Sequence, residues 1–323
     1  MLAPALHRTE SRPGTRIVPP HEAILGVLLL AELAVFCIIG RHFVSADNAF
    51  EIVRLSVEVG LLALAMTPVI VTGGIDLSVG SLMALCAVLF GKMFRDAGLP
   101  VGLAAVLTIG IGVLAGLLNA ALITGLRLPP LIVTLGSFSL FRGLAEGLTG
   151  GSDSFMCPAS FLFLGKGAQI PIFLAAAAGF WVLLHRSTVG RGLYAIGLSP
   201  EGARYAGIPV GRRVALVYVL SGAVAALSSL IYVSRYTQAR ADAGTGYELL
   251  AITAVVLGGT SIFGGRGRIS GTLLGLFAIA VLERGMKLAD LGDQLARILV
   301  GVLLLVALGA NALLERISTR RSA

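Results

Sequence analysis

Residues 247–288 read YELLAITAVVLGGTSIFGGRGRISGTLLGLFAIAVLERGMKL, two apolar runs joined by a turn rich in glycine and arginine at 263–268. A third apolar run follows and extends to residue 305. Such a surface would not stay dispersed in water, whereas an apolar helix of about 20 residues crosses a bilayer with its backbone groups paired internally. The stretch therefore predicts an all-α integral membrane protein.

The composition of all 323 residues extends this prediction to the whole chain. Charged residues make up 13% and hydrophobic residues 56%, compared with roughly 25% charged residues in soluble domains. The mean hydropathy is +0.93. We expect one transmembrane domain at 23–313, polar tails at 1–22 and 314–323, and no appended catalytic or nucleotide-binding module.

Apolar runs between charges, prolines and glycine pairs predict about ten transmembrane helices. The number depends on Gly73-Gly74, which can break one helix instead of connecting two, and on Pro129-Pro130, which force an abrupt turn. The predicted spans lie near 24–40, 52–72, 77–94, 101–125, 130–148, 169–185, 214–234, 248–264, 271–288 and 295–313.

The positions of the basic residues predict the orientation, because loops rich in Lys and Arg tend to stay in the cytoplasm. An even number of spans keeps the two basic tails on the same side, and we expect both termini to be cytoplasmic. The long polar loop at 186–213 belongs to that side, since it carries Arg186, Arg191, Arg204, Arg212 and Arg213. The first span could instead be a signal peptide cleaved near 44–46, but its polar leader of 22 residues is long for that role.

Several function classes are not supported by the sequence. The net charge of +8 is spread among apolar spans and forms no basic run with interleaved aromatics, so nucleic-acid binding is not predicted. Cys37 and Cys86 fall in spans and Cys157 stands alone in a loop, which gives no disulfide framework. No zinc spacing, phosphate-binding loop or nucleophile turn occurs, so we predict no catalytic residue, metal site or cofactor.

Two segments are the candidates for function. At residues 72–81, Gly73 and Gly74 precede Asp76 and Ser78 between two apolar runs, which favours a capped hairpin but also suits a broken helix beside a transport cavity. In the loop 190–210, Ser199-Pro200-Glu201 can begin a short helix and Gly207 can end it. That helix could tie two spans together or dock a soluble partner, and the length of the loop favours docking.

Charged residues inside the spans need partners or a function. Arg142 and Glu146 are four residues apart and are predicted to pair on one helix face. Glu58 is predicted to make a satisfied contact between helices, with a proton-coupling role as the alternative. Four glycines spaced by four residues predict close contact between helices: Gly112, Gly116, Gly271 and Gly275.

Several segments together resemble the membrane subunits of bacterial ATP-binding cassette (ABC) sugar importers of the ribose type. The segments are 73–81, 128–137 continuing to Arg142-Gly143 and Gly150-Gly151, the loop 190–210, and 247–252 continuing through Gly258-Gly259-Thr260-Ser261 to Gly271-Thr272. Residues 234–242 look closest to permeases for rhamnose or for the furanosyl signal autoinducer-2. Leu198-Ser199 and Pro130-Leu131 depart from the common pattern of the family and weaken the assignment of one sugar.

The resemblance implies a type II ABC importer-like permease fold in the bacterial inner membrane, with about ten helices. It implies as partners ABC ATPase subunits, a periplasmic sugar-binding protein, and a second permease subunit that is identical or paralogous. The predicted coupling helix maps to Gly197, Pro200, Glu201, Ala203, Ala206, Gly207 and Ile208. The candidates for the translocation pathway are Gly73, Gly74, Asp76, Ser78, Thr134 and Ser137.

Two other functions remain open from the sequence. A stand-alone secondary transporter would use Glu58 or Asp76 as its ion-coupled acid and would import without ATP. A purely structural membrane subunit would tolerate substitution of Asp76 and Thr134. Uptake by the chain alone, abolished by a protonophore, would distinguish the first alternative from an ATP-driven importer.

Overall fold

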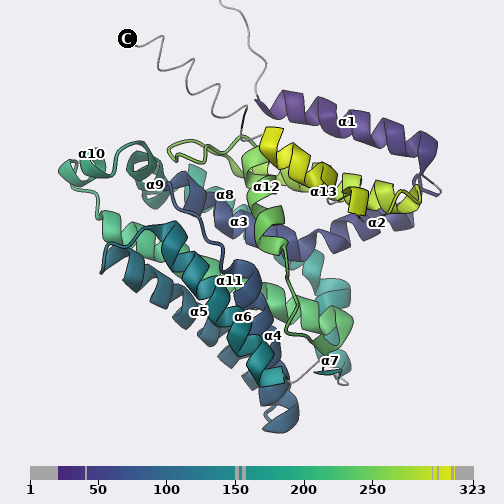
Figure 1. Cartoon of the computed structure of the whole chain (residues 1–323), viewed down its shortest axis with the longest axis horizontal. Helices are drawn as coiled ribbons and strands as arrows, with labels where there is room; N and C mark the ends of the chain where they lie inside the picture. The colour runs from purple at the N-terminus through teal and green to yellow at the C-terminus, as the bar shows by residue number, and fades with distance from the viewer. Residues whose placement is uncertain are drawn as a thin grey trace, which may run out of the picture.

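The computed structural model describes residues 21–40, 42–149, 153–154, 158–292, 294–296, 298–306 and 309, which form a bundle of helices (Figure 1). Cys157 and the predicted tails, except residues 21 and 22, lie outside the described residues. The α-helices and strands are α1 (His21–Ile39), α2 (Ala46–Leu55), α3 (Val57–Val71), α4 (Val79–Gly91), α5 (Val101–Thr124), α6 (Pro130–Thr149), β1 (Asp153–Ser154), α7 (Ala159–Phe163), α8 (Gln169–His185), α9 (Thr188–Leu198), α10 (Pro200–Tyr205), α11 (Val210–Tyr236), β2 (Gln238–Ala239), α12 (Tyr247–Leu257) and α13 (Ile269–Leu288). Two π-helical turns, η1 (Lys92–Asp96) and η2 (Leu164–Ala168), continue α4 and join α7 to α8.

Six helical segments in the described part of the chain are long and apolar enough to cross a membrane. The pair α2 and α3, bent by 46°, can supply a seventh span. The six are Glu22–Ile39, Val101–Thr124, Pro130–Thr149, Ser160–His185, Val210–Tyr236 and Ile269–Leu288. The other predicted spans coincide with shorter helices, namely α4, α12 and Gln294–Val306.

The short helices α3, α4 and α12 lie inside the bundle. Every residue of α3 is buried, and so is every residue of α4 except Leu89. A helix that faces lipid must match the thickness of the hydrocarbon core, whereas a helix covered by its own chain does not have to. Burial therefore explains why apolar runs that read as full spans form helices of only 15, 13 and 11 residues.

Glycine pairs end two of these inner helices in the same way. Gly73, after α3, has φ +81°, and Gly259, after α12, has φ +84°. This left-handed backbone stops a helix and is nearly free of strain only for glycine. The sequence left open whether Gly73-Gly74 breaks a helix, and in the structure residues 72–78 are a non-helical connection between α3 and α4.

The predicted glycine spacings bring helices into close contact. A Cβ at Gly112 of α5 would lie 2.4 Å from the carbonyl oxygen of Gly222 in α11, and one at Gly116 would lie 2.5 Å from that of Tyr218. A Cβ at Gly271 of α13 would lie 2.0 Å from the carbonyl oxygen of Gly258, just after α12, and one at Gly275 would lie 2.2 Å from that of Ala254 in α12. Both pairs of helices therefore pack backbone to backbone.

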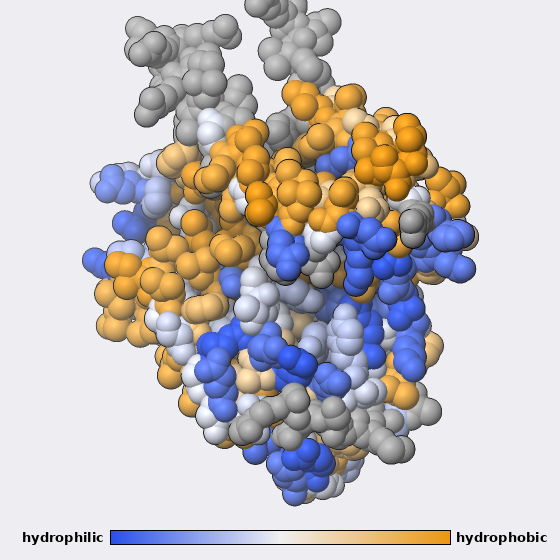
Figure 2. All heavy atoms as spheres, turned by 45° about the vertical axis from the view of Figure 1, so that its right-hand side comes forward, coloured by the Kyte–Doolittle hydropathy of each residue, from blue (hydrophilic) through white to orange (hydrophobic). Residues whose placement is uncertain are grey.

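Large apolar side chains cover the outer surfaces of α1, α5 and α6. Examples are Ile38, Val106 and Ile132, which are 85%, 69% and 65% exposed. Figure 2 shows apolar surface over the upper part of the molecule, where α1 and α13 lie, and a hydrophilic band across the middle of that face. An apolar exterior of this size fits contact with lipid.

The side chain of Arg142 does not make the predicted pair with Glu146 among the described residues. Its Nη1 donates to the carbonyl oxygens of Ala241 and Ala243, in the connection between α11 and α12. The spacing of four within one helix could not reveal these oxygens, which approach from residues about 100 positions away. Arg142 thus links this connection to α6. The antiparallel pairing of β1 with β2, Asp153 with Ala239 and Ser154 with Gln238, is a second contact to the same connection.

Candidate functional site

The connection between α3 and α4 reaches into the bundle because its glycines allow close approach. A Cβ at Gly74 would lie 2.4 Å from the hydroxyl oxygen of Tyr218 in α11. Gly73 itself is exposed, with the carbonyl oxygen of Phe263 3.6 Å from the position of a Cβ. The two glycines therefore lead the chain from the surface to a buried position at Asp76.

Asp76 is buried, and both of its carboxylate oxygens accept hydrogen bonds. The backbone N–H and the hydroxyl of Ser78 donate to Oδ1 at 3.0 Å and 2.6 Å. The hydroxyl of Ser221 in α11 donates to Oδ2 at 2.7 Å. The carboxylate thus holds Ser78, the N-cap residue of α4, and joins it to α11, while no side chain makes a capping hydrogen bond to the first turn of α4.

The same cluster continues into α5 and α6. Asn119 of α5 donates from Nδ2 to the hydroxyl oxygen of Ser78 at 3.0 Å, and its Oδ1 accepts from Ser137 of α6 at 2.5 Å. Thr134, also on α6, donates to the carbonyl oxygen of Ile75 at 3.0 Å. The four polar side chains predicted for the pathway therefore lie together, around residues 75–78.

We call the side chains of Asp76, Ser78, Asn119, Thr134, Ser137 and Ser221 the Asp76 cluster. All six residues are buried, between 0% and 5% exposed, so the cluster is a closed network within this chain. Sequence reasoning missed Asn119 and Ser221. The signal for Asn119 was its amide in the middle of an apolar run, because a polar group within a membrane span usually has a structural or functional partner.

The second predicted segment folds as the expected short helix. Ser199 is the N-cap of α10, and its hydroxyl accepts from the backbone N–H of Gly202 at 3.0 Å. Pro200 takes the first position, where a missing N–H is tolerated. Gly207, with φ +76°, ends the turn. The helix is therefore defined by the three residues that the sequence singled out.

Most of α10 is open to its surroundings. Tyr205 is 93% exposed and Leu198, just before the helix, is 70% exposed, while Ala203 is buried at 4%. Of the other residues predicted for coupling, Pro200, Glu201, Ala206 and Gly207 are exposed, and Gly197 and Ile208 are half-buried. A helix that keeps one small residue inside and presents a ring, an aliphatic chain and a carboxylate outside suits contact with another protein.

Gly197 connects α9 and α10 to the inner helices. A Cβ at this position would lie 2.0 Å from the carbonyl oxygen of Val71 and 2.2 Å from the backbone nitrogen of Gly265. That nitrogen donates to the same carbonyl oxygen at 2.9 Å, and the hydroxyl of Tyr194 donates to the carbonyl oxygen of Gly267 at 2.8 Å. Only two residues therefore separate the exposed helix from Gly197, which contacts the end of α3, where the connection to Asp76 begins.

Glu58 forms a contact between helices through Oε2, whereas its buried Oε1 has no hydrogen-bond partner among the described residues, so the predicted contact is satisfied at one oxygen only. Its Oε2 lies 3.1 Å from Nη1 of Arg235 on α11, and the two side chains are 0% and 7% exposed. The guanidinium also donates to the carbonyl oxygen of Arg54 at 2.8 Å and to the hydroxyl of Tyr236 at 2.6 Å. A carboxylate paired in this way already has a structural role, which weakens its candidacy as an ion-coupled acid.

Within the part of the chain that the structure describes, no three His, Cys, Asp or Glu side chains are grouped as metal ligands. Cys37 and Cys86 carry free thiols. The two segments that the sequence singled out thus correspond to the Asp76 cluster and the exposed helix α10.

Comparison with known proteins gives consistent matches over nearly the whole chain. The family model described as branched-chain amino acid transport system / permease component matches residues 48–308. The autoinducer 2 import system permease protein LsrD of Salmonella typhimurium is 36% identical over 321 residues, which cover 94% of this chain and 96% of that protein. LsrD of Escherichia coli O9:H4 is 36% identical over 308 residues, covering 91% and 93%. No solved structure was found to match.

Proposed function

The chain belongs to the family of branched-chain amino acid transport system permease components, and we propose that it imports autoinducer 2 or a closely related sugar-like molecule. It is a multi-pass membrane protein, the permease component of an ABC importer, and it performs no catalysis itself. The observation that carries the proposed substrate is the end-to-end similarity to LsrD permeases.

The proposed fold is that of a type II importer with about ten helices crossing or entering the membrane. Six long helices and the α2–α3 pair account for seven. The remaining three are α4, α12 and Gln294–Val306, which are too short to cross a bilayer unaided; α4 and α12 each adjoin a non-helical connection, at residues 72–78 and 258–268. Non-helical backbone at membrane depth is tolerated where the protein itself covers it, as it is around Asp76.

The proposed orientation places α9 and α10 in the cytoplasm. Their segment carries Arg186, Arg191, Arg204, Arg212 and Arg213, and basic connections favour the cytoplasmic side. Both termini are then cytoplasmic as well. The opposite ends of α11 and α13, near Arg235 and Lys287, face the periplasm in this orientation, where a binding protein would deliver the substrate.

We propose that α10 is the docking helix for the ATPase partner. Closure of two ATPase subunits on ATP would push on the exposed side chains of α10, and Gly197 would pass the displacement to Val71 and the residues that follow α3. No cation belongs to the Asp76 cluster, so its hydrogen bonds can be exchanged for others without separating an ion pair. Rearrangement of that cluster would open the pathway between this chain and a second permease subunit, identical or paralogous.

A variant with Gly207→Trp tests the docking helix. A residue with a side chain is strained at φ +76° and would place a large ring at the end of α10. We expect correct insertion, loss of the ATPase on co-purification, and loss of ATP-driven uptake of autoinducer 2 by proteoliposomes that contain the complete transporter and its binding protein. Gly202→Ala is the matched control, because a Cβ there would meet only the side chain of Ser199, at 3.2 Å.

Unchanged co-purification and uptake for Gly207→Trp would remove α10 from the docking role. Uptake by the purified chain alone, lost on adding a protonophore and indifferent to ATP, would instead establish an ion-coupled secondary transporter. If the complete transporter hydrolyses ATP but imports no autoinducer 2, the proposed substrate is wrong, and uptake of rhamnose and ribose should be measured instead.

A further inference from the structure

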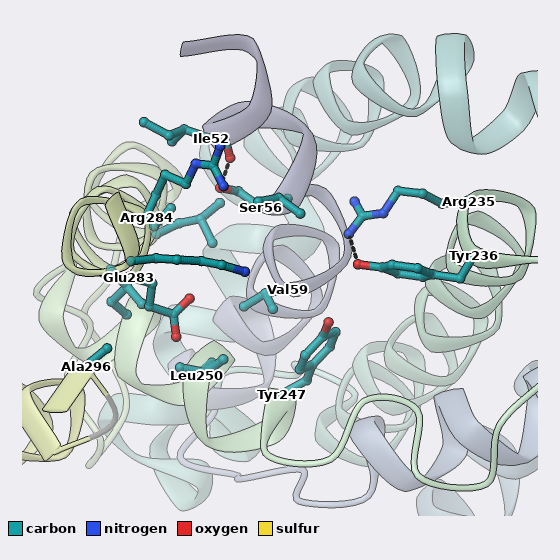
Figure 3. A pocket seen from close by; sticks show the side chains of 15 residues that line it. Ile52, Ser56, Val59, Arg235, Tyr236, Tyr247, Leu250, Glu283, Arg284 and Ala296 are labelled. Atoms are coloured by element: carbon teal, nitrogen blue, oxygen red, sulfur yellow. Dashed lines mark hydrogen bonds between the residues drawn. The ribbon is translucent and has the colours of Figure 1, made fainter. Parts of the chain in front are cut away.

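A cavity of about 300 Å³ (Figure 3) lies at the end of α11 that is farther along the chain from α10. It is bounded by the bend between α2 and α3, the last residues of α11 and α13, and the first turn of α12. The other ends of α11 and α13 lie beside α9, where Arg213 donates to the carbonyl oxygen of Thr188 and Tyr194 donates to that of Gly267. Because α11 has 27 residues, its two ends are roughly 40 Å apart.

The cavity is lined by polar and charged side-chain ends and by apolar side chains. Figure 3 shows Tyr236, Tyr247, Glu283 and Arg284 around it, with Val59 among them. The aliphatic side chain of Leu250 also lines it. Two phenols, one carboxylate, the guanidiniums of Arg235 and Arg284 and the ammonium of Lys287 supply donors and acceptors, and the aromatic rings offer flat apolar faces. Small-ligand sites are usually cavities of this kind, mostly apolar with a few placed polar groups.

The polar groups are held in place before any ligand arrives. Arg235 bonds at the same time to Glu58, to the carbonyl oxygen of Arg54 and to the hydroxyl of Tyr236, so it fixes the phenol at the edge of the cavity. Its guanidinium carbon also lies 4.6 Å from the centre of the Tyr236 ring. Nε of Arg284 donates to Asn48 at 2.8 Å, which orients the second guanidinium. Groups fixed in this way lose little freedom on binding a ligand.

We propose that this cavity is a binding site for a small neutral polyhydroxy molecule, a furanose-sized sugar, which it receives on the side away from α10. The inference rests on the proposed function and adds a site to it. The charge of Arg235 is met by Glu58, and the cavity then presents the carboxylate of Glu283 beside the cations Arg284 and Lys287, so it offers acceptors and donors together, as a molecule with several hydroxyls requires. Vicinal hydroxyls can bond to a carboxylate and a guanidinium at once, while Tyr247 and Leu250 cover the carbon face of the ring.

Protection of a single thiol provides the test. Cys37, Cys86 and Cys157 are replaced by serine, and Ala280→Cys places a thiol in the cavity wall. Gly147→Cys is the matched control, since this exposed position on α6 has no neighbouring atom within 4 Å of a Cβ. The complete transporter, in vesicles of phosphatidylcholine with or without phosphatidylglycerol, is labelled with a neutral maleimide in the presence or absence of autoinducer 2 or rhamnose.

We expect sugar to slow labelling at Ala280→Cys by about tenfold at concentrations ten times the dissociation constant, and to leave Gly147→Cys unchanged. Glu283→Gln and Tyr247→Phe, each added to Ala280→Cys, should raise the half-protecting concentration by about tenfold, as expected for one lost hydrogen bond to a ligand. Two variants are used so that a folding defect in one does not decide the result, and assembly with the ATPase verifies each.

Equal labelling of Ala280→Cys with and without sugar, in vesicles where the transporter imports autoinducer 2, would overturn the inference and leave the proposed function intact. Protection that needs phosphatidylglycerol and no sugar would also overturn it, because the occupant would then be a lipid phosphate. Absence of any ATP-driven import would count against the proposed function, whatever the labelling shows.

Discussion

Asp76 and Glu58 are both buried acids that join α11 to an inner segment, but different groups hold them. Asp76 accepts from the hydroxyls of Ser78 and Ser221 and from one backbone N–H, all of them neutral donors. Glu58 faces the guanidinium of Arg235. Separating a buried ion pair leaves a charge without its counter-ion, whereas a carboxylate that accepts from hydroxyls can exchange one hydroxyl for another. We infer that the ion pair between Glu58 and Arg235 stays formed during transport, whereas the hydrogen bonds of Asp76 can be exchanged.

The largest expected effect is for Arg235→Met, which leaves the carboxylate of Glu58 buried without its cation. Removing one partner of a buried ion pair costs about 3–5 kcal/mol of stability. We expect a large fall in the melting temperature of the purified protein in detergent. The double variant Glu58→Gln with Arg235→Met should recover most of the loss, because no buried charge then remains unpaired.

The matched control is Arg240→Met, whose exposed partner is Asp242. This substitution should leave the melting temperature unchanged, since a solvent-exposed ion pair adds little stability. Equal melting temperatures for Arg235→Met and Arg240→Met would show that the ion pair between Glu58 and Arg235 does not hold α3 and α11 together more strongly than an exposed pair does.

A smaller effect is expected for Asp76→Asn, which keeps the shape of the side chain. Its amide nitrogen cannot accept a hydrogen bond, so Ser78 or Ser221 loses a partner, at a cost of about 1–3 kcal/mol. If the cluster rearranges during transport, ATP-driven uptake should fall by more than the loss of folded protein explains. Asp47→Asn, on the exposed first turn of α2, serves as the control, and full uptake by Asp76→Asn would leave the cluster a purely structural role.

The smallest effect is expected for Tyr218→Phe. The hydroxyl of Tyr218 is buried beside Gly74 and has no hydrogen-bond partner among the described residues. Removing it should leave stability unchanged, or slightly improved, within about 1 kcal/mol. Tyr194→Phe is the contrasting variant, because its hydroxyl donates to Gly267, and it should lose about 1 kcal/mol. A large loss in Tyr218→Phe would show that this hydroxyl belongs to the Asp76 cluster.

The sequence predicted best the features that depend on neighbouring residues. The apolar runs located α5, α11 and α13, and Ser199 with Gly207 located α10, because caps and left-handed turns act over a few positions. The predicted span at 52–72 is instead divided between α2 and α3, which meet at a bend of 46°. Hydropathy does not show such a bend, because it reports how apolar a run is and not the direction of the helix axis.

Contacts between segments that are far apart in the chain could not be predicted from the sequence. The bonds of Arg142 to the connection before α12, and of Asn119 to Ser78 and Ser137, depend on how the helices pack. The candidates Asp76, Ser78, Thr134 and Ser137 were nevertheless found, because polar residues beside glycine or proline in apolar surroundings are rare. That they share one closed network could be learned only from the structure.

The shortness of α12 has a consequence for how the protein is made. Its 11 residues reach only about 16 Å, roughly half of the hydrocarbon thickness. We expect the insertion machinery to pass over such a segment when it emerges, so α12 must enter the bilayer together with α13. A chain truncated after Leu257 should therefore leave α12 accessible to protease, whereas a chain truncated after Leu288 should protect it.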